Sequence, residues 1–204
     1  MRIFHSFRTI LRVNWYPYLV SNIVVYGILL MAMIVSVYIP GLHDIGHRNT
    51  DAFLSSPGSS LVAEAYSSGS IVRPALLTFL GNLLFGALGT TTLPTLIIPF
   101  FGVVATIARA VFIGMPYAPT SLEELITVIT VSPVLLIEFQ AYVLAMLGSI
   151  ILWRSTFGYR RLNLSSAWEG YLAGVKDNLR LYPMIVILLL VIALVEAVTA
   201  LFLH

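Results

Sequence analysis

Long apolar runs, separated by short polar segments, dominate the pattern of this sequence. The first run occupies residues 15–39, and comparable runs follow through to the carboxyl end. A helix needs about 20 consecutive apolar residues to cross the hydrocarbon core of a bilayer, so these runs have the length of membrane-spanning helices. The sequence predicts spans over residues 15–39, 74–90, 94–114, 125–153 and 182–203.

Turn-forming residues set the limits of the later spans. The sequence Gly-Thr-Thr-Thr-Leu-Pro over residues 89–94 predicts a tight turn between the second and third spans. Ser121 and Glu124 have the spacing of a helix-capping box, which begins the fourth span. Pro133 lies inside that span, so the first turns either lie at the membrane surface or form a separate short helix.

The polar segments have three different characters. Residues 1–14 alternate arginines with apolar residues and predict a basic amphipathic helix on the membrane surface. Residues 40–72 are rich in Ser and Gly and predict an extramembrane loop or small hairpin. Apolar residues recur at helical spacing in residues 154–181, which predicts an interfacial helix before the last span. No internal repeat is evident, and we expect residues 1–204 to form a single integral membrane domain.

Composition supports a bilayer as the surroundings of this chain. Apolar residues make up 59% and charged residues 10%, whereas soluble domains carry roughly a quarter charged residues. The mean hydropathy is +0.96. There is too little charge to solvate a globular surface, so the predicted fold class is an all-α polytopic transmembrane helical bundle with the lipid bilayer as its main partner. The net charge is +2, but only one of the eleven basic residues is a lysine, and no basic patch is interleaved with aromatic residues. This pattern excludes nucleic acid as a partner.

Basic residues gather on one side of the predicted topology. Three arginines precede the first span, and five basic residues lie between the fourth and fifth spans. Four spans separate these two segments, so both fall on the same side, which the positive-inside rule makes cytoplasmic. We therefore expect a multi-pass cell-membrane protein with a cytoplasmic amino terminus, a cytoplasmic segment 154–181 and an external carboxyl terminus.

Three ionisable residues lie inside predicted spans: Arg109, Glu138 and Glu196. Each costs roughly 2.5 to 3.5 kcal/mol on insertion scales if it faces lipid. The helical rise places all three roughly 7 to 10 Å below the outer surface of the hydrocarbon core. They predict an intramembrane polar cluster, in which the guanidinium clamps both carboxylates or the three residues relay protons or ions. Arg109 alone could instead snorkel to the surface, and Gln140 is expected to form a separate interhelical hydrogen bond.

Small residues mark the second and third predicted spans. Gly86, Gly89 and Gly102 allow close approach of helix backbones, and Asn82 offers one polar interhelical bond. We interpret them as packing residues within the subunit, and a homo-oligomer interface is the alternative.

Catalytic, cofactor and metal motifs are not apparent. His43 and His47 have the i, i+4 spacing that binds a divalent metal on a helix, but Pro40, Gly41 and Gly46 argue against a helix there. Cysteine is absent, which excludes disulfides and thiolate metal sites. There is no nucleophile elbow and no phosphate-binding loop. We therefore expect no metal, no cofactor and no enzymatic activity.

Three short segments together resemble the stage II sporulation protein M family of integral membrane proteins. They are Thr78-Phe-Leu-Gly-Asn82, Pro133-Val-Leu-Leu-Ile-Glu138-Phe-Gln-Ala141 and Ile192-Ala-Leu-Val-Glu196-Ala, within a similarity spanning roughly residues 78–203. In that family the middle segment reads P-H-G-x-x-E-L-x-A, and here a Val-Leu pair replaces its His-Gly. The resemblance implies a membrane scaffold, since the namesake helps to localise cell-wall remodelling enzymes in spore formers. It implies no catalytic residues.

Two functions follow as expectations. The first is a non-enzymatic membrane scaffold or accessory subunit that holds unknown membrane or extracytoplasmic protein partners. The alternative is a small channel or carrier in which the intramembrane carboxylates move protons or ions. A scaffold should have its charged residues bonded to one another, whereas a carrier should expose them to a polar path.

Overall fold

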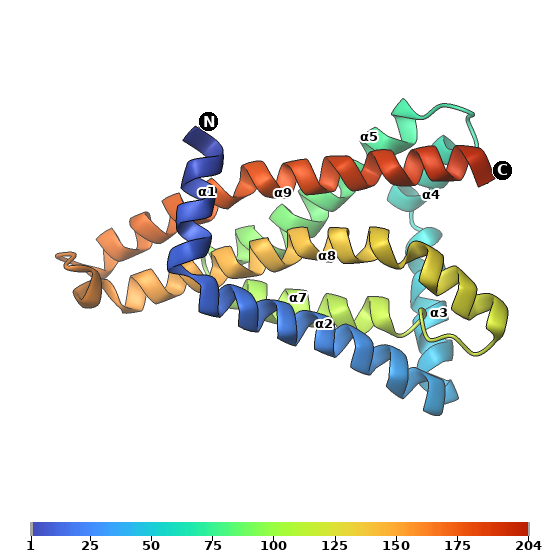
Figure 1. Cartoon of the computed structure of the whole chain (residues 1–204), viewed down its shortest axis with the longest axis horizontal. Coiled ribbons are helices and arrows are strands. Elements are labelled where there is room, and N and C mark those ends of the chain that lie inside the picture. The colour runs from blue at the N-terminus through green and yellow to red at the C-terminus, as the bar shows by residue number, and fades with distance from the viewer. Residues whose placement is uncertain (1, 204) are drawn as a thin grey trace.

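The computed structural model describes residues 2–203, which form an all-α helical bundle (Figure 1). Helices run back and forth along the long axis of the molecule, with two short helices packed across one end. The elements in chain order are α1 (Arg2–Val13), α2 (Trp15–Tyr38), α3 (Pro40–Leu54), α4 (Pro57–Tyr66), α5 (Val72–Leu80), the π-helix η1 (Gly81–Thr92), α6 (Leu93–Thr95), α7 (Phe101–Gly114), α8 (Leu122–Phe157), the 3-10 helix η2 (Tyr159–Leu162) and α9 (Ala167–Leu203).

Four helical stretches are long and apolar enough to cross a membrane, which confirms the predicted fold class. They are Trp15–Tyr38, Val72–Thr95, Leu122–Phe157 and the helix that begins at Ala167. The third predicted span is represented by α7, a shorter apolar helix of 14 residues. At 1.5 Å per residue it is about 21 Å long, less than the roughly 30 Å of a hydrocarbon core. It nevertheless runs beside α2 and α8 through the bundle (Figure 1).

The two ends of the bundle differ in character. At one end α1 crosses the others, and α8 and α9 are joined there through η2; we call this the α1 end (Figure 1). At the other, α3 and α4 pack across the bundle beside the carboxyl-terminal part of α9; we call this the α3–α4 end (Figure 1). The first part of α8 also projects at the α3–α4 end, where it bends away from the rest of the bundle.

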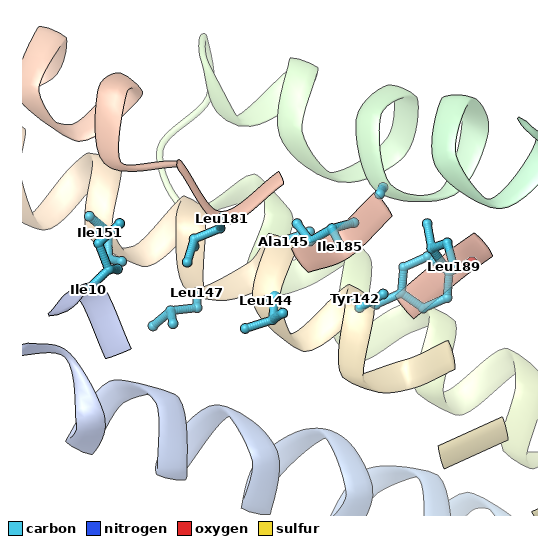
Figure 2. Close-up of a cluster of buried hydrophobic side chains, with 11 residues drawn as sticks. Ile10, Tyr142, Leu144, Ala145, Leu147, Ile151, Leu181, Ile185 and Leu189 are labelled. Atoms are coloured by element: carbon cyan, nitrogen blue, oxygen red, sulfur yellow. The ribbon is translucent and has the colours of Figure 1, made fainter. Parts of the chain in front are cut away.

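The core is built around α8, which contacts α2, α7, η1 and α9. One buried cluster joins α8 to α9 and includes Ile10 from α1 (Figure 2). A second joins α8 to α2 and α7 through residues such as Val25, Ala110 and Phe139. Ile10 is 7% exposed, so the amphipathic helix α1 places its apolar side on the bundle.

The predicted turn at residues 89–94 is wrong. The helix continues through this segment as η1 and α6, and the connection to α7 comes afterwards, with Phe100 in the left-handed region at φ 57°. The threonine hydroxyls are accommodated within the continued helix, because Thr90 and Thr91 both donate to the carbonyl oxygen of Gly86, at 2.8 and 3.0 Å. Pro94 lies in the last turn of this continuous stretch, one residue before α6 ends.

Residues 40–72 form two helices rather than a loop or a hairpin. Pro40 is the first residue of α3, a position where its fixed φ favours a helix. Gly46 is buried where α3 packs, because a Cβ there would lie 2.8 Å from Met115 Cβ and Pro116 N. Pro40 therefore begins the helix and Gly46 allows it to pack closely, whereas a Cβ on Gly41 would meet nothing within 4 Å.

Residues 154–181 do not contain a separate interfacial helix. The link between α8 and α9 covers only residues 158–166, and residues 167–181 are the first turns of α9. They pack on the end of α8, since a Cβ on Gly174 would lie 2.6 Å from the Cα of Leu152. α8 is likewise continuous, with Pro133 inside it, so its first turns are not a separate helix.

Candidate functional site

Arg109 on α7 lies against η1 and α8. Its guanidinium carbon is 4.1 Å from the centre of the Tyr142 ring, the geometry of a cation–π contact. Its Nη2 donates to Thr90 Oγ1 at 2.6 Å and to the carbonyl oxygen of Gly86 at 3.2 Å. Arg109 thereby connects three elements, while its buried Nη1 has no hydrogen-bond partner among the described residues.

Tyr142 on α8 lies between Arg109 and Glu138. Its side chain is 2% exposed, and its hydroxyl donates to Glu138 Oε1 at 3.0 Å. Arg109 and Glu138 are also close enough to interact electrostatically. One aromatic side chain thus offers its ring to the cation and its hydroxyl to the carboxylate.

Glu196 on α9 lies within electrostatic range of Glu138. Among the described residues it forms neither a hydrogen bond nor an ion pair, and its side chain is partly exposed. Among the described residues, therefore, no cation is bound directly to Glu196.

Two tyrosines at the α3–α4 end lie near these carboxylates. Burial raises the pKa of Tyr117, and the charges of Glu138 and Glu196 raise it further. Burial also raises the pKa of Tyr66, which shares a hydrogen bond of 3.2 Å with Thr78 and lies within electrostatic range of Glu196. The carboxylates thus lie in the part of the bundle nearest to α4 and to the α7–α8 connection.

The structure brings Arg109, Glu138 and Glu196 into one region, but not as the predicted clamp. Within residues 2–203 no ion pair joins Arg109 to either carboxylate. The Tyr142 ring lies against the guanidinium and its hydroxyl reaches Glu138, so Tyr142 connects the two charges instead. A direct clamp of two carboxylates by one guanidinium is therefore wrong.

Two of the predicted packing residues lie at close contacts between elements. A Cβ on Gly86 would lie 2.8 Å from the Tyr142 hydroxyl oxygen, so the ring fits only against a glycine. A Cβ on Gly102 would lie 2.9 Å from both Ser149 Cβ and Thr95 Oγ1. In both cases the close neighbours belong to this same chain.

The other two predicted packing residues, Gly89 and Asn82, do not lie at such close contacts between elements. A Cβ on Gly89 would meet only the Leu84 backbone of its own helix, and Asn82 forms no side-chain hydrogen bond with a described residue. The predicted interhelical bond of Gln140 is confirmed, because its Nε2 donates to the Tyr18 hydroxyl at 2.7 Å and its Oε1 accepts from Tyr26 at 3.2 Å.

Sequence reasoning missed a buried hydroxyl network nearer the α1 end. Thr95 Oγ1 accepts from the Gly102 backbone N–H at 2.7 Å and contacts Ser149 Oγ at 3.1 Å. The indole of Trp153 donates to the Thr95 carbonyl oxygen at 2.7 Å, and Tyr171 donates to Leu96 at 3.0 Å. This network holds the connection between α6 and α7 against α8 and α9. The run of threonines over residues 90–95 was the available signal, but it was interpreted as a turn.

The histidines of α3 lie side by side. His43 Nε2 and His47 Nε2 are 3.1 Å apart, with ring centres separated by 4.3 Å. Within the described residues no group of three or more His, Cys, Asp or Glu side chains has the arrangement of a metal site.

Comparison of the chain with protein-family models, curated proteins and solved structures finds no match to any of them.

Proposed function

We propose that this protein is a non-enzymatic integral membrane scaffold or accessory subunit, in the manner of the stage II sporulation protein M family that its sequence resembles. The observation that carries the proposal is the chain of contacts from Thr90 through Arg109 and Tyr142 to Glu138. It joins η1, α7 and α8 inside the bundle. We call these four residues the polar lock.

The polar lock uses charged groups as structural bonds. A charge exposed to hydrocarbon costs several kcal/mol, so intramembrane charges either pair within the protein or line a polar path. Here Arg109 has a π-face, a hydroxyl and a carbonyl as partners, and Glu138 has a phenolic donor. Groups bonded in this way hold helices together, which suits a rigid platform for other proteins.

The arginine distribution gives this platform an orientation. The α1 end holds the arginines of α1 and the basic residues in and beside the link between α8 and α9, so by the positive-inside rule it faces the cytoplasm. The α3–α4 end then lies outside, together with the carboxyl end of α9. Membrane or extracytoplasmic proteins are the partners that this arrangement favours.

One observation favours the second candidate, a small carrier or channel. Glu196 forms no hydrogen bond or ion pair with a described residue, and it lies within electrostatic range of Glu138. Two neighbouring carboxyl groups without a shared cation can hold and release a proton. In this function Glu196 would be essential, whereas in a scaffold it is dispensable for activity.

Ion flux through reconstituted protein distinguishes the two functions. Purified protein is placed in lipid vesicles, and internal pH is followed while a membrane potential is applied. A scaffold should give proton uptake equal to that of protein-free vesicles. Uptake above that level in the wild type, lost in Glu196→Gln, would establish the carrier and reject the scaffold.

Purification from native membranes tests the positive claim. A tagged wild-type chain should retain a specific membrane or extracytoplasmic protein, and Glu196→Gln should retain it equally. Arg109→Leu should retain less of it, because the lock that shapes the platform is broken. Recovery of the chain alone from gently solubilised membranes would contradict the proposal.

A further inference from the structure

The pair His43 and His47 has the geometry of a metal chelate. Both residues lie on α3, and their i, i+4 spacing places them on one face of that helix. Their Nε2 atoms are 3.1 Å apart and their ring planes are inclined by 69°. At this distance one ring donates its Nε2–H to the other. Movement of that proton to Nδ1 leaves two Nε2 lone pairs close together.

The nitrogen separation matches the requirements of divalent transition metals. Zinc binds imidazole nitrogen at about 2.0 to 2.1 Å, so two tetrahedral ligands lie about 3.3 Å apart. Adjacent ligands in a square-planar copper(II) or nickel(II) site at similar bond lengths lie about 2.9 Å apart. The observed 3.1 Å lies between these values, so the separation of the two nitrogens fits a shared cation once the donor ring turns its lone pair toward it.

The packing of α3 fixes where this pair lies. Gly46 fits against Met115 and Pro116 in the connection between α7 and α8, and this contact holds α3 beside the start of α8. His43 there lies close enough to Glu124 for electrostatic interaction. A carboxylate near the pair favours a cation, although Glu124 Oε2 is already bonded to Thr120.

We propose that His43 and His47 form a binding site for a divalent transition-metal cation at the α3–α4 end. The two Nε2 atoms are its protein ligands. Water completes the coordination, because no third His, Cys, Asp or Glu among the described residues joins the group. The site is open to solvent, since His47 is exposed. It is independent of the polar lock and of the scaffold function.

Calorimetric titration of Zn²⁺ into the purified full-length chain tests the site. The chain carries no histidine tag, because a tag would bind the same metal. One Zn²⁺ per chain is expected, and His43→Ala or His47→Ala should each weaken binding at least about tenfold, since even loss of an indirect supporting contact commonly weakens a metal site by that factor. His5→Ala is the matched control, because His5 lies on α1 with a threonine as its neighbour.

Copper(II) electron paramagnetic resonance reports the ligands directly. The wild-type spectrum should show coupling to two imidazole nitrogens, and each single variant should show one. Circular dichroism should be unchanged in all variants, which separates loss of a ligand from loss of fold. Absence of Zn²⁺ binding, or binding and spectra that His43→Ala and His47→Ala leave unchanged, would overturn the proposal.

Discussion

Tyr142 is the residue on which the interior of this bundle depends. It is almost fully buried, its ring faces Arg109 and its hydroxyl bonds to Glu138. The same ring packs edge-to-face on Phe139, with centres 5.9 Å apart. Its position requires that Gly86 on η1 carry no side chain. The polar lock and the packing of three elements therefore share one side chain.

Substitution of Gly86 should test this dependence. Gly86→Ala would place a Cβ 2.8 Å from the Tyr142 hydroxyl oxygen, and overpacking of this kind typically destabilises by about 1 to 3 kcal/mol. Gly27→Ala is the matched control, because a Cβ on Gly27 meets nothing within 4 Å. It should leave stability unchanged or raise it by up to about 1 kcal/mol, as alanine favours a helix. Denaturant unfolding in detergent measures both, and equal effects would argue against the close contact.

The sequence identified the charged members of the site but not their connection. Arg109, Glu138 and Glu196 are conspicuous because charges are rare in apolar runs, and the helical rise was enough to place them at similar depth. Tyr142 is not conspicuous, since tyrosine is common in membrane helices. Which groups meet depends on the rotation of each helix about its axis, and spacing along the chain does not determine that rotation.

The helices α8 and α9 show the same limit at the scale of elements. Their apolar runs predicted two spans. An amphipathic segment before a span has the same sequence pattern whether it lies on the membrane surface as a separate helix or forms the first turns of the span. Gly174 decides the matter by letting the start of α9 pack on Leu152 of α8. In the same way, a glycine-threonine-proline run typical of turns is helical here, with its threonine hydroxyls bonded to carbonyl oxygens of the preceding turn.

The continuous form of α9 predicts an exposed Trp168. Helices of 36 and 37 residues are about 54 and 56 Å long, so they extend well beyond a core of roughly 30 Å. The ring of Trp168 stacks on that of Tyr171, with centres 5.3 Å apart, but its side chain is 63% exposed. It lies at the α1 end, where α8 and α9 are joined.

Fluorescence quenching measures this exposure. In a variant with Trp15→Phe and Trp153→Phe, iodide should quench Trp168 efficiently in lipid vesicles. A second variant with Trp153→Phe and Trp168→Phe keeps Trp15 alone, and the iodide quenching of Trp15 provides the comparison. Protection of Trp168 from iodide would instead place this segment at the membrane interface.

At the scale of the whole molecule, charge differs between the two ends. Most basic residues lie at the α1 end, while α3 and α4 at the opposite end carry Asp44, Asp51 and Glu64 against one arginine, Arg48. Apolar runs and arginine counts were sufficient to predict a multi-pass helical bundle. They did not predict that the third span, expected over residues 94–114, would be a helix of only 14 residues.

Cysteine labelling in intact cells tests the orientation. The chain contains no cysteine, so single cysteines at Ser55 and Ser165, both exposed, report the two ends. A membrane-impermeant thiol reagent should label Ser55→Cys in intact cells and Ser165→Cys only after permeabilisation. The reverse pattern would invert the topology.

The central claim is that the intramembrane charges hold the bundle together, and a double-mutant cycle on Arg109 and Tyr142 tests it most directly. The free energy of unfolding is measured in detergent for Arg109→Leu, Tyr142→Leu and the double variant. Tyr142→Phe keeps the ring and serves as the control. A second cycle that starts from this variant, with Arg109→Leu and a leucine at position 142, should give a similar coupling energy.

The account predicts a coupling energy of about 0.5 to 2 kcal/mol between Arg109 and Tyr142, since a desolvated cation–π contact contributes that much. The double variant should therefore be less destabilised than the sum of the two single variants. Unfolding free energies that add within experimental error would contradict the polar lock.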